Sequence, residues 1–205
     1  MKQYPSIPSW KEGAILGLPI IAFEKLDGSN IRAEWSKKKG WYKFGSRHQM
    51  IDTSHPELGE AIPLFLDKYG DNLARIFMKD KLYREAKSII VYFEFFGPNS
   101  FAGLHDPNDN KDVILFDVNP IPKNFVLPRQ LLKDFHDVEL PRVVYEGNLN
   151  VSFRDAVISG EYEVAEGVVC KGEHQKKPYR VKIKTQAWLD RVKALYGEQG
   201  LKELA

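Results

Sequence analysis

The most constraining feature of this chain is an apolar run that ends at a lysine just before a tight turn. Residues 18–23 read Leu-Pro-Ile-Ile-Ala-Phe, and residues 24–30 read Glu-Lys-Leu-Asp-Gly-Ser-Asn. An Asp-Gly pair is typical of a β-turn between two strands. In one interpretation Lys25 is then a solvated residue beside the turn. In the other, the sheet holds its amine at the mouth of a cleft, where it can act as a nucleophile.

Further motifs downstream favour the second interpretation. They occupy residues 45–47 (Gly-Ser-Arg), 92–97 (Tyr-Phe-Glu-Phe-Phe-Gly), 115–118 (Leu-Phe-Asp-Val), 166–171 (Glu-Gly-Val-Val-Cys-Lys) and 181–184 (Val-Lys-Ile-Lys). Together with residues 24–30, and in this order, they resemble the motifs of the covalent nucleotidyltransferases, which are DNA ligases, RNA ligases and mRNA capping enzymes. The first motif and the phenylalanine at position 116 point to the nick-sealing RNA ligases of bacteriophages and kinetoplastids. The likeness covers about residues 20–185.

The expected fold class is α+β, because strands mixed irregularly with helices favour antiparallel sheets. The resemblance implies a nucleotidyltransferase (ATP-grasp-like) domain, in which antiparallel sheets with flanking helices enclose a nucleotide cleft. We expect residues 1–185 to form this adenylation domain and residues 186–205 to form a C-terminal helix packed on it.

Local patterns predict the individual elements. Residues 31–35 and 41–45 flank a Lys-Gly turn and predict a hairpin, and residues 88–96 and 113–118 predict strands. Residues 164–171 and 178–184 predict a second pair of strands.

Helical spacing appears in four places. It covers residues 56–82, with a break at Gly70-Asp71, and residues 127–137 and 152–159, the last N-capped by Ser152. From Thr185 onward, one apolar helix face is predicted from Trp188, Leu189, Val192, Leu195 and Tyr196.

The resemblance assigns the chemistry to a few residues. Lys25 would attack the α-phosphorus of ATP, expel pyrophosphate and hold AMP through a phosphoramidate bond. Lys182 and Lys184, on the same side of a strand, would lower the pKa of Lys25 and neutralise the reacting phosphate. Glu166 would face Mg²⁺, which is bound through few protein oxygens. The alternative for the two lysines is a solvent-facing basic strip.

The same resemblance supplies the residues that contact the nucleotide. Glu94 would reach the ribose hydroxyls, and Phe116 would stack on the purine. Asn30 and Arg47 would reach the sugar and phosphates, and Glu24 would lie beside the adenine. Lys182 and Lys184 would also contact the nucleotide. Without the family, Glu94 is interpreted as one half of a salt bridge and Phe116 as a core residue.

Composition constrains the cellular compartment of the protein more than its function. The net charge is only +2, but lysines cluster at residues 37–39 and 176–177, as suits contacts to a nucleic-acid backbone or soluble hairpin tips. No apolar run approaches the ~20 residues of a membrane span. The single cysteine, Cys170, agrees with a reducing compartment, so we expect a cytoplasmic protein.

The leading hypothesis is an ATP-dependent RNA ligase that joins 3′-hydroxyl and 5′-phosphate ends, with ATP and Mg²⁺ as cofactors. The expected partners are RNA ends, including nicked duplexes. The involvement of an accessory or end-processing protein stays open. Little chain follows Lys184, so we expect no oligonucleotide-binding barrel. Asp27, as in DNA ligases, keeps a minimal DNA ligase open. A guanylyltransferase and a non-catalytic nucleotide- or RNA-binding module also remain as alternatives.

Overall fold

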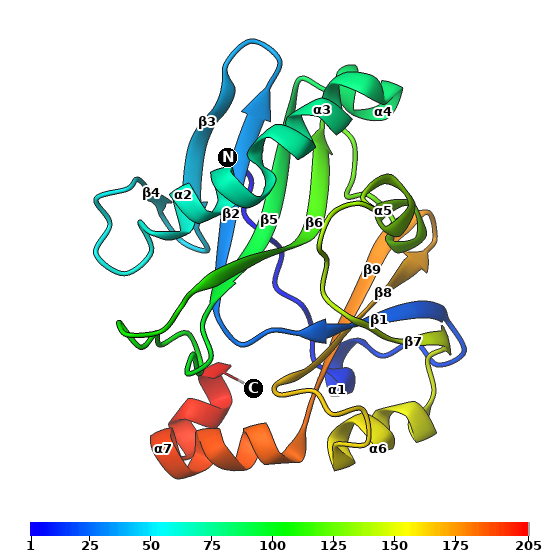
Figure 1. Ribbon diagram of the computed structural model, residues 1–205. Helices are drawn as coiled ribbons and strands as arrows, with labels where there is room; N and C mark the ends of the chain where they lie inside the picture. Colours follow the sequence, from blue (N-terminus) through cyan, green and yellow to red (C-terminus); the bar gives the residue numbers. More distant parts are fainter. Residues whose placement is uncertain (205) are drawn as a thin grey trace. The chain divides into compact units, whose positions relative to one another are not determined.

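The computed structural model describes residues 1–204 and contains two antiparallel sheets (Figure 1). The chain divides into two compact units. Unit 1 comprises Met1–Pro5 and Gly28–Leu140, and unit 2 comprises Ser6–Asp27 and the residues from Pro141 onward. Each unit holds one sheet. This arrangement confirms the α+β class and the antiparallel sheets expected from the sequence.

The sheet of unit 1 has the strand order β4-β3-β2-β5-β6. Its strands are β2 (Ser29–Ser36), β3 (Gly40–Ser46), β4 (Met50–Ile51), β5 (Ser88–Phe96) and β6 (Asp112–Ile121). The predicted hairpin is confirmed, since β2 and β3 pair across the turn at residues 37–39. The lysines of that turn are exposed. The predicted strands at residues 88–96 and 113–118 are β5 and the main part of β6.

Helices cover one face of this sheet (Figure 1). They are α2 (Ala61–Phe65), the π-helix η1 (Leu66–Gly70), α3 (Asp71–Lys79), α4 (Lys81–Arg84) and α5 (Pro128–Asp134). The predicted break at Gly70-Asp71 is wrong. Gly70 keeps helical angles, φ −50° and ψ −54°, and η1 runs directly into α3. The main core fills this layer, with Phe65 stacked on Phe93.

The N-terminal segment packs against the opposite face of the unit 1 sheet. Tyr92 and Phe125 form a small cluster with Tyr4 and Met1. The Tyr92 hydroxyl donates to the carbonyl of Lys2 over 3.0 Å, and the Tyr4 hydroxyl donates to Asp117 Oδ2 over 2.8 Å. This face is therefore aromatic and polar, unlike the helix-covered face.

The sheet of unit 2 has the strand order β7-β1-β8-β9. Its strands are β1 (Pro19–Lys25), β7 (Val143–Asn148), β8 (Gly167–His174) and β9 (Lys177–Lys184). Hence the two strands that flank the Asp-Gly turn belong to different sheets. The short helix α1 (Trp10–Gly13) precedes β1.

Helix α6 (Val151–Ser159) packs on one face of the unit 2 sheet. The predicted cap at Ser152 is wrong, because the side chain of Asn150 accepts from the backbone N–H of Phe153 over 2.8 Å. Cys170 lies in the core below this helix, and burial raises the pKa of its thiol to about 12.

Helix α7 (Gln186–Leu204) confirms the predicted C-terminal helix, with a kink where Gly197 has φ +64°. Ala205, the last residue of that prediction, lies outside the described residues. Trp188 and Val192 are buried. The predicted apolar face is shorter than expected, since Leu195 is 60% exposed and Tyr196 is 39% exposed. Over residues 1–204, no helix has both the length and the apolar character needed to cross a bilayer.

Candidate active site

Three strands of unit 2 place Lys25 and Lys184 on either side of one glycine. Lys25 ends β1 and lies opposite Gly167 of β8, which lies opposite Lys184 of β9. Gly167 has φ +150°, and a Cβ there would lie 2.1 Å from the carbonyl oxygen of Ile183. Only glycine permits this approach of β8 to β9, so the glycine of the 166–171 motif sets the spacing between the two lysines.

Glu166 joins the two lysines. Its side chain is 4% exposed. Its Oε2 lies 2.6 Å from Lys25 Nζ, and its Oε1 lies 2.8 Å from Lys184 Nζ. A buried carboxylate that bridges two ammonium groups keeps all three side chains in fixed positions. The structure therefore brings together three of the residues that the sequence analysis singled out.

Lys184 is more deeply buried than Lys25. Its pKa is lowered to about 8. Burial is the largest cause, Glu166 opposes the shift, and the nearby ammonium groups of Lys25 and Lys182 contribute to it. Its Nζ lies 3.5 Å from the ring centroid of Trp188 and donates to the carbonyl of Leu204. Lysines with pKa values near neutrality are typical of functional sites.

Lys182 lies one alternation before Lys184 on β9. It is opposite Val169, which is opposite Phe23 of β1. Lys182, Lys184 and Lys25 thus project from the same face of the sheet, because alternate residues of a strand share a face. This face of unit 2 is cationic, whereas the opposite face packs on α6.

Glu24 has partners away from this cluster. Its Oε2 lies 3.1 Å from Arg142 Nε, and its backbone N–H donates to the carbonyl of Arg142 over 2.8 Å. As the neighbour of Lys25 in β1, it points to the other side of the sheet. Its contact with adenine stays a prediction.

Sequence reasoning missed the role of Asp27 and Trp188. The Nε1–H of Trp188 donates to Asp27 Oδ2 over 2.6 Å. The same indole ring lies under Lys184. The signal in the sequence is a tryptophan in the first turn of α7, four residues beyond Lys184, where helical spacing alone predicts only an apolar face.

The other predicted nucleotide contacts lie in unit 1. Asn30 and Glu94 are opposite each other on β2 and β5. Phe116 occupies the irregularity between the pairs Tyr92–Asp117 and Phe93–Leu115, and Tyr4 meets its ring edge-on at 5.1 Å. Arg47 follows β3 and is exposed. Their meeting with the unit 2 residues in one nucleotide cleft stays a prediction.

The residues present fit a magnesium ion that is held mainly by substrate. Within the described part of the chain, no group of three or more His, Cys, Asp or Glu side chains forms a metal cage. Mg²⁺ at phosphate sites commonly uses one or two carboxylates, waters and the substrate phosphates. Glu166 is a carboxylate of this kind, and its contact with a metal stays a prediction.

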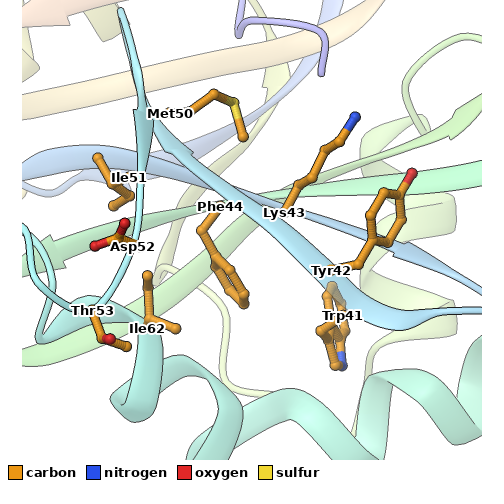
Figure 2. A pocket seen from close by; sticks show the side chains of 9 residues that line it. All are labelled: Trp41, Tyr42, Lys43, Phe44, Met50, Ile51, Asp52, Thr53 and Ile62. Atoms are coloured by element: carbon orange, nitrogen blue, oxygen red, sulfur yellow. The ribbon is translucent and has the colours of Figure 1, made fainter.

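A hollow of about 370 Å³ lies elsewhere in unit 1 (Figure 2). Its lining comprises Trp41, Tyr42, Lys43, Phe44, Met50, Ile51, Asp52, Thr53 and Ile62. None of the predicted site residues lines it, so it has no part in the site described above.

The solved structures that share this fold include several of the Naegleria gruberi RNA ligase. A variant with ATP and Mn matches with a TM-score of 0.65 and 16% identity, over 94% of this chain and 58% of that chain. The ligase with PPi matches with 0.64 and 17%, over 95% and 58%. A variant with AMP and Mn matches with 0.63 and 16%, over 93% and 58%.

The present chain thus spans little more than half the length of that ligase. No curated protein sequence matches this chain. The family model described as RNA ligase matches residues 18–191, which include every predicted site residue. With this match over most of its length, the chain belongs to the RNA ligase family.

Proposed function

We propose that this chain is an ATP-dependent RNA ligase that joins 3′-hydroxyl and 5′-phosphate RNA ends. The supporting observation is the arrangement in unit 2, where Lys25 and Lys184 share the buried carboxylate of Glu166. The lysines lie in motifs of the family, and RNA ligases of this type hold AMP on a lysine. Solved relatives that carry ATP, AMP, PPi and Mn support ATP and a divalent metal as cofactors.

In this proposal Lys25 Nζ forms a bond to the α-phosphorus of ATP while the bond to pyrophosphate breaks. The amine must first lose the proton that its contact with Glu166 now favours. Lys182 and Lys184 disfavour a third ammonium group beside them and stabilise the charge on the reacting phosphate. Glu166 would hold Mg²⁺, which when bound neutralises charge on the phosphates of ATP.

AMP is then transferred to the 5′-phosphate of an RNA strand. A 3′-hydroxyl attacks that phosphate, forms the phosphodiester bond and releases AMP. Asn30, Arg47, Glu94 and Phe116 of unit 1 would contact the nucleotide. RNA repair in the cytoplasm, with an accessory or end-processing protein, stays an expectation.

One observation favours a second candidate, a minimal DNA ligase. Asp27 occupies a position where DNA ligases commonly have aspartate. In the structure its Oδ2 accepts from Trp188, which gives this aspartate a role within the fold that does not depend on the substrate. The contact therefore weakens the case for DNA without removing it.

Two comparisons test the proposal. In the first, covalent labelling is measured with α-labelled ATP and with α-labelled GTP. We expect label from ATP alone, whereas label from GTP indicates a capping-type enzyme and no label indicates a binding module. In the second, nicked duplexes carry RNA or DNA on each side of the nick at one salt concentration.

We expect ribonucleotides on the 3′-hydroxyl side to speed sealing strongly, because the 2′-hydroxyl distinguishes RNA from DNA. Ribonucleotides on the 5′-phosphate side should matter less. Equal sealing of all-DNA nicks would contradict the RNA assignment and favour the DNA ligase.

A further inference from the structure

Arg32 of β2 is a buried cation without a partner. The residue is 3% exposed, and its Nε and Nη1 are buried with no hydrogen-bond partner. No residue in the described part of the chain forms an ion pair or a hydrogen bond with its guanidinium. Burial lowers the pKa of Arg32, but arginine keeps its charge in proteins.

The surroundings of Arg32 leave room for this guanidinium. Its Cα partners are Gly45 on β3 and Tyr92 on β5. A Cβ at Gly45 would lie 3.0 Å from Arg32 Nε and 3.0 Å from the Cε of Met1. The glycine of the 45–47 motif therefore makes space for the Arg32 head group, with the N-terminal residue beside it.

Other polar atoms without partners share this face of the sheet. The Oδ1 of Asn30, two residues before Arg32 on β2, is buried without a partner. Asn119 of β6 is fully buried, and neither atom of its amide has a partner. Buried polar groups are usually satisfied, so a group of such atoms on one face points to something that binds there.

Water alone does not complete the environment of Arg32. An ordered water can accept hydrogen bonds from buried N–H groups, but it carries no counter-charge. Two buried carboxylates share this face. Glu34, two residues after Arg32 on β2, is hydrogen-bonded to Tyr42, and Asp117 lies two strands away across Tyr92. Its Oδ2 already accepts from Tyr4. The missing partner of Arg32 is therefore an anion.

We propose that the guanidinium of Arg32 binds a phosphate group of the substrate, next to the contact expected for Asn30. The proposal rests on the proposed function, in which the substrates are ATP and RNA. A guanidinium matches phosphate geometry with paired N–H donors.

The test uses Arg32→Met, Arg32→Lys and the matched control Arg75→Met, since Arg75 is exposed on α3 of the same unit. The thermal unfolding midpoint of each protein is titrated with pyrophosphate, ATP, a 5′-phosphorylated RNA oligonucleotide and the same oligonucleotide without that phosphate. Arg32→Met should bind those probes whose phosphate Arg32 contacts at least about tenfold more weakly, because charge-assisted bonds to phosphate are strong. Arg32→Lys should be intermediate, and Arg75→Met should match the wild type.

The probes separate the sources of phosphate. Weaker binding of ATP and pyrophosphate assigns Arg32 to the nucleotide, and weaker binding of RNA alone assigns it to the RNA strand. Without ligand, the midpoint of Arg32→Met should be unchanged or higher, because the variant removes an unbalanced buried charge.

If Arg32→Met binds all four probes with the affinity of the wild type, the proposal is overturned, whatever the unfolding midpoint of the variant without ligand. A lowered midpoint with unchanged affinity would instead assign Arg32 to a structural pair with Asp117. Covalent labelling of the wild type by ATP is read separately. If labelling succeeds while binding is unaffected, the Arg32 site fails and the proposed function stands. If labelling fails, the pyrophosphate and RNA titrations still decide the Arg32 site.

Discussion

The Nε1–H of Trp188 donates to Oδ2 of Asp27 over 2.6 Å, although 161 positions separate the two residues. The ring of the same tryptophan lies 3.5 Å from Lys184 Nζ. One side chain of α7 thus contacts the turn after Lys25 and the lysine that shares Glu166 with Lys25. Helix α7 belongs to the candidate site as well as to the fold.

Trp188→Phe keeps an aromatic face under Lys184 and removes the donor to Asp27. We expect a loss of about 1–2 kcal/mol in the free energy of unfolding, because a part-buried carboxylate loses one hydrogen bond. Adenylation should slow several-fold, since the turn after Lys25 becomes less fixed. Denaturant unfolding and single-turnover labelling measure the two effects.

Trp188→Leu, which removes the ring as well, is the comparison. It should slow adenylation more than Trp188→Phe does. Wild-type labelling rates in both variants would show that the contacts of Trp188 have no part in positioning the site.

Glu166→Gln removes the charge shared by Lys25 and Lys184 while preserving the shape of the side chain. The variant leaves two ammonium groups facing a neutral amide. We expect about 3 kcal/mol of lost stability, as when one partner of a buried ion pair is removed. Adenylation should fall by about 100-fold or more and respond less to Mg²⁺ or Mn²⁺, measured by titrating labelling with each metal. A metal titration that superimposes on the wild type would remove Glu166 from the metal role.

The lowered pKa of Lys184 predicts how stability depends on pH. Below pH 8 the lysine is protonated in both the folded and the unfolded protein, and the folded state carries the cost of the buried charge. Between pH 8 and 10.5 the folded protein loses the proton first. Stability should therefore rise with pH across this window, by about 3 kcal/mol for a shift of this size. The measurement is the difference in unfolding free energy between the wild type and Lys184→Met from pH 7 to pH 10.5. A difference that stays constant would contradict the lowered pKa.

The same titration should appear in catalysis. The kcat/KM for adenylation should fall above about pH 8, because neutral Lys184 no longer stabilises negative charge on the phosphate. Lys184→Arg keeps a positive charge at every pH tested, so its profile should lack this descending limb. A limb of equal size in the arginine variant would assign the ionisation to another group.

Much of the fold followed from local patterns. The Lys-Gly turn predicted the β2–β3 hairpin, and the dense apolar run at residues 88–96 predicted β5. Local patterns failed at two positions. Gly70 was expected to break a helix, but the π-helical turn before it continues into α3. Ser152 was a plausible cap, but Asn150 occupies the capping position.

Sequence reasoning also singled out, from motif order, three charged residues that the structure brings together: Lys25, Glu166 and Lys184. It could not find the partners that folding brings from elsewhere. The contact between Trp188 and Asp27 has no local sequence signal. Arg32 resembles any polar residue of an alternating strand, and only its burial without a partner distinguishes it.

Lys25 is the residue that we expect to become covalently bound to AMP. The direct measurement is to incubate the protein with ATP and Mg²⁺, digest it, and locate the added AMP by peptide mass. We predict one adenylated residue, Lys25, and no adduct in Lys25→Ala, which should remain folded because Lys25 lies outside the hydrophobic core. AMP on a different lysine, or an adduct that persists in Lys25→Ala, would contradict this account.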